Sequence, residues 1–193
     1  MFAWSTFLTY AFITAITPGP NNIMSWGNGM KQGFVRALSF NFGVLFGFLI
    51  VMFGCAFACA TLSAVMPSIM GPMRIVGTIY LVWLAWSIWR SSNAVDASPK
   101  TAGFRTGALL QFVNVKIYFY GLISMQIFVL PVYSGDAVMI GFFAALLAFM
   151  GFACTLCWSA FGHAFRSIYA RYEKAVNAVM AIGLLWCAYS PYQ

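Results

Sequence analysis

Acidic side chains are scarce in this chain of 193 residues, which contains three Asp and Glu against ten Lys and Arg. Charged residues amount to 7% of the sequence, whereas a soluble domain carries about a quarter. Hydrophobic residues amount to 63%, and the mean hydropathy is +0.87. This composition excludes a soluble domain and predicts an all-α integral membrane protein.

The three acids, Asp96, Asp136 and Glu173, lie between apolar runs, so we expect no carboxylate within the membrane. Their positions exclude an obvious proton relay through Asp or Glu and argue against a strongly cationic ligand, which needs a buried counter-charge. The net charge of +7 comes from basic residues in short loops and does not indicate nucleic-acid binding. Because no nucleophile motif, metal-ligand cluster or phosphate loop is present, we expect neither an enzyme nor a cofactor.

Cysteine is also uncommon, with five residues that all lie within apolar runs. Cys154 and Cys157 have the spacing of a thiol redox pair, so a membrane thiol-disulfide electron carrier is the alternative function. No His or basic residue lies within five positions of the pair to stabilise a thiolate. We therefore interpret both as small apolar packing residues.

Apolar runs long enough to cross a bilayer, which takes about 20 residues, dominate the chain. Six such runs are predicted, at about 2–26, 38–62, 73–89, 107–130, 137–162 and 175–189. The first charge is Lys31, so no basic segment precedes the first run. We expect that run to remain as a helix rather than to be a cleaved signal peptide.

Basic residues are concentrated in the odd-numbered loops between these runs: Lys31, Arg36, Arg90, Lys100, Arg105, Arg166, Arg171 and Lys174. The second loop contains Arg74 alone, and the fourth loop and both tails contain none. Because cytoplasmic loops collect Lys and Arg, the odd loops are predicted to be cytoplasmic and both termini to lie outside.

A polar stretch from Arg90 to Arg105 divides the chain into halves of three runs each, about 1–95 and 103–193. An odd number of crossings per half inverts the second half relative to the first. The sequence therefore predicts a single transmembrane domain, 1–193, built as a 3+3 inverted repeat of six helices, which is common among secondary transporters. Within it, Gly43 and Gly47 have the spacing that allows close helix approach.

The first run contains Thr17-Pro18-Gly19-Pro20-Asn21-Asn22, in which two prolines flank a glycine and two amides follow. Proline lacks a backbone donor and clashes with the preceding turn, so helix one is predicted to be broken at Pro18-Gly19-Pro20. In a bilayer such a break is tolerated only where the freed backbone lines a cavity or is buried in protein. We interpret the six residues as half of a binding site, with a simple kink or a helix end as the alternative.

An inverted repeat predicts a matching feature in the fourth run, where Gln111, Asn114 and Lys116 occur. Lys116 lies about 15 Å from the start of that run by helix rise, near the centre of a core about 30 Å thick. A charge at that depth requires a cavity or a partner.

The two motifs together predict a site for a small zwitterionic amino acid. Its carboxylate would bind Lys116 and the free amides of the broken helix. Its ammonium would bind carbonyls of residues 17–19 and the side chains of Asn21, Asn22 and Asn114, with Gln111 facing the same cavity. A secondary transporter in a lipid bilayer is the leading interpretation. The thiol-disulfide electron carrier is the second, and a passive channel or a membrane chaperone is the third.

These motifs resemble the LysE/RhtB family of bacterial amino-acid exporters. Residues 17–22 are similar to its first-helix signature, and Val76-Gly77-Thr78-Ile79-Tyr80-Leu81-x-x-Leu84-Ala85, ending at Arg90-Ser91, resembles its third-helix pattern. The resemblance covers nearly the whole chain. It departs at Asn114-Val115-Lys116, where the family usually has Asn-Pro-Lys, so we expect helix four to be less broken than in relatives.

The run from Gln111 to Ile117, with valine at 115, resembles the cysteine/O-acetylserine exporter branch of the family, as does Ile50-Val51-Met52. This resemblance implies a bacterial inner-membrane exporter of cysteine and O-acetylserine, with both termini periplasmic and with coupling to the proton motive force. Because no acid is expected within the membrane, the position of Lys116 motivates the hypothesis that it is the proton site.

Overall fold

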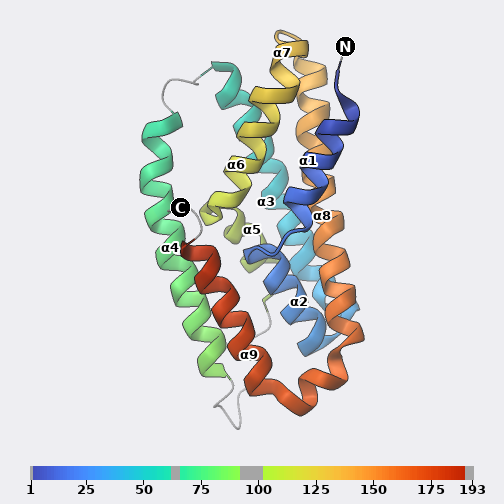
Figure 1. Cartoon of the computed structure of the whole chain (residues 1–193), viewed down its shortest axis with the longest axis vertical. Helices are drawn as coiled ribbons and strands as arrows, with labels where there is room; N and C mark the ends of the chain where they lie inside the picture. Colours follow the sequence, from blue (N-terminus) through green and yellow to red (C-terminus); the bar gives the residue numbers. More distant parts are fainter. Residues whose placement is uncertain (1, 62–65, 92–101, 190–193) are drawn as a thin grey trace.

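The computed structural model describes residues 2–61, 66–91 and 102–189, and almost all of them are helical (Figure 1). The helices are α1 Trp4–Ile16, α2 Pro20–Gln32, α3 Phe34–Thr61, α4 Met66–Ser91, α5 Phe104–Val113, α6 Val115–Ile123, the π-helix η1 Ser124–Val129, α7 Leu130–Tyr133, α8 Ala137–Ala164 and α9 Arg166–Tyr189. α9 bends at Tyr172, whose backbone is not helical (φ −128°, ψ 38°).

Several helices are longer than the apolar runs that predicted them, because they continue through polar and charged residues. α2 extends to Gln32, and only Gly33 separates it from α3. Gly33 has φ +83°, a left-handed conformation that glycine adopts without strain, so the chain turns sharply there. Most of the predicted polar linker, including Asp96 and Lys100, lies outside the described residues.

Membrane crossing is supported by the length and composition of the helices. Among the described residues, three segments are long and apolar enough to span a bilayer: Phe34–Cys59, Val115–Tyr133 and Ala137–Ala164. Two shorter apolar helices, Trp4–Ile16 and Ile75–Arg90, accompany them. The prediction of an all-helical membrane protein is confirmed, whereas the six-span inverted repeat stays a prediction.

Close backbone contacts hold the bundle together. α2 packs mainly against α8, α3 packs against α5 and α8, and α4 lies along α9 (Figure 1). A Cβ atom on Gly43 would overlap the backbone of Phe104, and one on Gly47 would lie 2.6 Å from Ala108 O. The predicted close helix approach at these glycines is therefore confirmed, and α5 is the partner.

Buried polar side chains tie α2 to its neighbours. Ser25 Oγ donates to Asn41 Oδ1 (2.9 Å), Asn41 Nδ2 donates to Ser159 Oγ (2.8 Å), and Ser159 Oγ donates to Ser25 O (3.1 Å). All three residues are fully buried. Because these side chains bond to one another, the triad links α2, α3 and α8 and holds α2 in position between its neighbours.

Candidate functional site

The junction between α1 and α2 is organised around backbone carbonyls that have no helical donor. α1 ends at Ile16 and α2 begins at Pro20. Thr17 closes α1 by donating its N–H and Oγ1 to the carbonyls four and three residues earlier, at 3.1 and 2.9 Å. Asn22, in the first turn of α2, donates Nδ2 to Ala15 O and to Thr17 O, both at 2.8 Å. Asn22 therefore stabilises the interrupted backbone.

Two side chains from distant parts of the chain complete this set. Trp158 Nε1, on α8, donates to Ile16 O at 2.9 Å. Lys116 Nζ, on α6, donates to Thr17 O and to Thr17 Oγ1, both at 2.9 Å. Every carbonyl from residue 13 to residue 17 thus has a donor. The carbonyl of Thr17, which we expected to bind a substrate ammonium, already accepts hydrogen bonds from Lys116 and Asn22.

The first turn of α2 has the opposite property, because its backbone donors are free. Gly19 precedes the helix in an extended conformation, no side chain caps it, and Pro20 carries no N–H. Within the described residues, the N–H groups of Asn21 and Asn22 donate to no protein acceptor. A helix N-terminus with free N–H groups attracts anions, through those groups and through the helix dipole.

Lys116 lies directly beside this helix start. A Cβ atom on Gly19 would lie 3.1 Å from both Cδ and Nζ of Lys116, so the missing side chain of Gly19 leaves the space that the lysine occupies. Lys116 is half-buried, and two of its three donors are used by Thr17. The third donor remains for a ligand.

The amide side chains lie together between the two motifs. Asn21 and Gln111 exchange hydrogen bonds, Nδ2 to Oε1 at 2.8 Å and Nε2 to Oδ1 at 3.0 Å. Asn114 Nδ2 reaches Asn21 Oδ1 at 3.4 Å. Gln111 also donates to Gly107 O at 2.7 Å and is fully buried. Gln111 was expected to face the cavity, but it lines neither of the cavities described below and instead holds Asn21 in place.

The fourth run is interrupted even though it lacks the family's proline. α5 ends at Val113, α6 begins at Val115, and Asn114 between them is extended (φ −86°, ψ 92°). The predicted single helix over 107–130 is therefore divided here and changes to a π-helix at Ser124. An asparagine adopts such a conformation readily because its side chain competes with helical backbone hydrogen bonds.

Two cavities meet at Lys116. The larger, about 600 Å³, lies between α1, α4, α6 and the end of α9, and Thr17 and Pro18 line it. The smaller, about 30 Å³, is lined by Gly19, Asn21 and Asn22. Of the predicted residues, Pro20, Asn114 and Lys116 line both, and Thr14 and Tyr120 do so as well. Eight of the nine predicted residues therefore line one cavity or the other.

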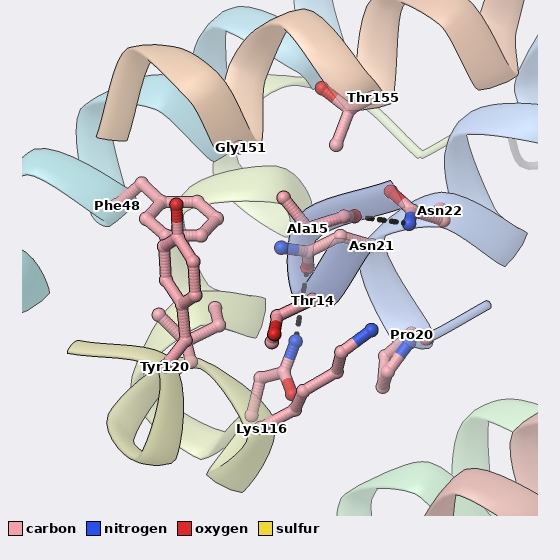
Figure 2. Close-up of a pocket in the computed structure, with 13 residues that line it drawn as sticks. Thr14, Ala15, Pro20, Asn21, Asn22, Phe48, Lys116, Tyr120, Gly151 and Thr155 are labelled. Carbon is pink, nitrogen blue, oxygen red and sulfur yellow. Dashed lines mark hydrogen bonds between the residues drawn. The ribbon is translucent and has the colours of Figure 1, made fainter. Parts of the chain in front are cut away.

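The smaller cavity also contains residues that the sequence analysis did not identify. Phe48 and Tyr120 lie together at one end, whereas Lys116 and Pro20 lie at the other (Figure 2). Other lining residues include Thr14, Ala15, Ile117, Gly151 and Thr155. Apolar and small side chains of this kind look like ordinary membrane-helix residues in the sequence, and nothing marks them.

Cys187 lines the larger cavity, whereas the Cys154–Cys157 pair lies outside both cavities. Cys154 is buried and Cys157 is exposed on α8, and all five cysteines are free thiols. The arrangement offers no support for the electron-carrier alternative.

Comparison with known proteins identifies relatives of this chain. The LysE type translocator family matches residues 12–190. The cysteine/O-acetylserine efflux proteins of Salmonella typhimurium (strain LT2) and Escherichia coli (strain K12) are 40% and 38% identical over 185 residues, covering 95% of this chain and 94% of each relative. No solved structure matches. The family and its relatives are transporters rather than enzymes, and the chain belongs to the LysE type translocator family.

Proposed function

We propose that this protein exports small neutral amino acids across the bacterial inner membrane, with cysteine and O-acetylserine as its main substrates. The substrates come from the names of the relatives that are 38% to 40% identical over 95% of the chain. The observation that carries the proposal is that the free N-terminus of α2 and the amine of Lys116 line one pocket within a membrane bundle.

The carboxylate of the amino acid binds where positive charge and free donors meet. Two unpaired N–H groups, at Asn21 and Asn22, and the third donor of Lys116 supply hydrogen bonds to its oxygens. Hydrogen bonds to an ionised group are stronger than neutral ones, which suits recognition of a carboxylate. Displacing one of the Lys116 bonds to Thr17 would couple binding to the junction between α1 and α2.

The ammonium binds neutral oxygens rather than a carboxylate. Asn22 and Asn114 bond to the protein through Nδ2, so we assign the ammonium to their side-chain oxygens. Among the described residues, no Asp or Glu lines either cavity. A ligand with a net positive charge would therefore meet Lys116 without a compensating acid, which favours a zwitterion.

The architecture proposed for this function is a 3+3 inverted repeat with six spans, halves at about 1–95 and 103–193, and helix one broken at Pro18-Gly19-Pro20. Two features support it. α1 with α2 and α5 with α6 are both interrupted helices, and each half contributes one to the site. The second helices of the halves, α3 and α8, pack together, and so do the third, α4 and α9.

The proposed topology has both termini in the periplasm, as the distribution of Lys and Arg predicts. Alkaline phosphatase fused after Gln193 should be active in cells, and a fluorescent reporter that folds only in the cytoplasm should be dark at the same position. The reverse pattern would refute this topology.

Transport is tested in inside-out membrane vesicles, into which an exporter carries its substrates. Cysteine and O-acetylserine should accumulate saturably, and a pH gradient should raise the accumulation. A variant with Cys154 and Cys157 replaced by Ala, which keeps Cys187 of the larger cavity, should transport O-acetylserine normally, and this result would discard the electron carrier. Linear, non-saturable entry would instead indicate a channel and refute the proposal.

Proton coupling through Lys116 is tested in the same vesicles. The Lys116→Arg variant keeps a positive charge that does not titrate in the working pH range. If Lys116 is the proton site, the variant should lose the response to the pH gradient while still exchanging substrate across the membrane. An unchanged response would exclude this role for Lys116.

A further inference from the structure

The smaller cavity extends away from the groups that bind a carboxylate and an ammonium. Lys116 and the start of α2 form one end, and Phe48 of α3 and Tyr120 of α6 form the other (Figure 2). An amino acid bound by its charged groups at the first end would direct its side chain toward the second. The shape and chemistry of that second end decide which side chains it accepts.

The far end of the cavity has rigid walls. The ring of Phe48 lies edge-on to the ring of Tyr120, with centroids 6.0 Å apart and an interplanar angle of 87°. Tyr120 is buried and anchored by its hydroxyl, which donates to Leu147 O at 3.2 Å. A Cβ atom on Gly151 would lie 2.7 Å from two atoms of the Phe48 ring. Tyr120 and Gly151 therefore fix the position of Phe48.

The space between these walls is small. The cavity has a volume of about 30 Å³ for the centres of water-sized groups, and one water needs about 10–15 Å³ on that measure. This volume includes the end beside Lys116 and the start of α2, so the end walled by Phe48 and Tyr120 accepts at most about two heavy atoms, the size of a CH₂–SH group. A longer ester side chain must displace the ring of Phe48 or extend toward the larger cavity.

The chemistry of the walls agrees with a neutral side chain. Thr155 Oγ1 donates to Phe152 O at 2.8 Å, and the hydroxyl of Tyr120 donates to Leu147, so both hydroxyl protons are used. Phe48 and Gly151 add no polar side-chain group to this end. A basic side chain would meet Lys116 and no acid.

We infer that the pocket walled by Phe48, Tyr120 and Gly151 receives the side chain of the transported amino acid and limits the size of side chain that fits without displacing Phe48. The inference rests on the proposed function, because it requires the carboxylate to bind at Lys116 and α2. Gly151 acts through Phe48 and is a positioning residue, whereas Phe48 contacts the substrate side chain. Substitutions at these two residues should shift the size preference in opposite directions.

The experiment measures competition in inside-out vesicles, with labelled O-acetylserine as the transported substrate and unlabelled alanine, cysteine, methionine and leucine as competitors. Phe48→Ala should improve competition by methionine and leucine relative to alanine by about tenfold, the lower end of the discrimination that one methylene provides. Phe48→Leu should give a smaller shift in the same direction. Gly151→Ala pushes the ring inward and should weaken O-acetylserine more than alanine.

Matched controls separate this effect from general damage. Phe46→Ala changes a ring on the same helix that is 53% exposed on the outside of the bundle. Gly141→Ala adds a methyl group on α8 where the nearest atom, on Phe53, is 3.6 Å away. Both controls should keep the wild-type ranking of competitors. If Phe48→Ala does not reach the membrane, the ranking of competitors in Phe48→Leu and Gly151→Ala tests the inference.

An unchanged ranking in Phe48→Leu and Gly151→Ala would overturn the inference. If Lys116→Ala then abolishes transport, the proposed carboxylate site stands and only the side-chain pocket is wrong. If Lys116→Ala transports normally, the site proposed for the whole amino acid fails as well.

Discussion

The two interruptions at the site differ in how their backbone groups are satisfied. The first leaves residues 17–19 outside any helix, and its carbonyls receive donors from α2, α6 and α8. The second involves Asn114 alone and is satisfied locally. Tyr118 Oη donates to Phe112 O at 3.3 Å, and Ile117 N donates to Asn114 O at 3.0 Å.

This difference indicates a division of roles. The first interruption depends on the second half of the chain, because Lys116 holds Thr17 across the bundle. At the second interruption, the carbonyls of Phe112 and Asn114 receive their donors from α6 in the same half, and α6 also supplies the lysine. A ligand that competes for Lys116 should therefore loosen the junction between α1 and α2 more than the junction between α5 and α6.

The largest effect is expected from Lys116→Ala. The variant loses the charge near the proposed carboxylate and two hydrogen bonds to Thr17, each worth about 1.5–3 kcal/mol for a charged donor. Initial uptake into inside-out vesicles should fall by more than about tenfold, since each 1.4 kcal/mol corresponds to a factor of ten.

Lys116→Met is the matched variant for this test, because it keeps most of the apolar stem and removes only the amine. It should be as inactive as Lys116→Ala while inserting and purifying like the wild type. Normal uptake in the Met variant would contradict the assignment of the amine to the substrate site.

The next effect concerns the stability of the first interruption. Asn22→Ala leaves the half-buried carbonyl of Ala15 without a donor, at a cost of up to about 1–3 kcal/mol. The thermal midpoint of the detergent-solubilised protein should fall accordingly. Asn114→Ala removes only the 3.4 Å contact with Asn21, so its thermal midpoint should fall less. An equal fall in the thermal midpoint of the two variants would mean that Asn22 does not stabilise the interrupted backbone more than Asn114 does.

A smaller effect is expected for the amide pair between the motifs. Asn21→Ala and Gln111→Ala should each destabilise the protein, because each leaves a buried amide without its partner. The double variant should be less destabilised than the sum, by about 0.5–3 kcal/mol, as for other residues in contact. Additive losses in thermal unfolding would show that the two side chains do not interact. Gln111 lies behind the cavity, so its variant should affect uptake less than that of Asn21.

The sequence predicted those parts of the site that conflict with a membrane environment. Two prolines and a buried lysine are costly in lipid, so residues 17–22 and Lys116 stood out from their surroundings. Asn41 carried a similar signal, an amide within the second apolar run, and it does form part of a buried polar triad. It could have been found by the argument that identified Asn114.

The remaining parts of the site had no such signal. Aromatic residues and glycine are also common where membrane helices face lipid, so the sequence does not mark Phe48, Gly151 or Trp158. Only the packing of α3 and α8 brings these residues to the site. The bounds of α2 and α9 were also missed, because hydropathy marks the apolar part of a helix and not its polar continuation. The distinction between Asn21, which contacts a side chain, and Asn22, which holds backbone carbonyls, depends on geometry alone.

The smallest effect should come from restoring the family's proline in the second interruption. Val115 is the first residue of α6, a position where proline is tolerated because its N–H has no helical partner. Asn114 before it is already outside the helical region, as a residue preceding proline requires. Val115→Pro should therefore change stability by about 1 kcal/mol or less, the loss of a methyl group that packs beside α4 near Gly77. Val113→Pro, two residues earlier and inside α5, removes a helical hydrogen bond and should cost about 3 kcal/mol or more. Comparable losses of thermal stability in both variants would mean that α5 and α6 are one continuous helix, and that only the first half of the chain is truly interrupted.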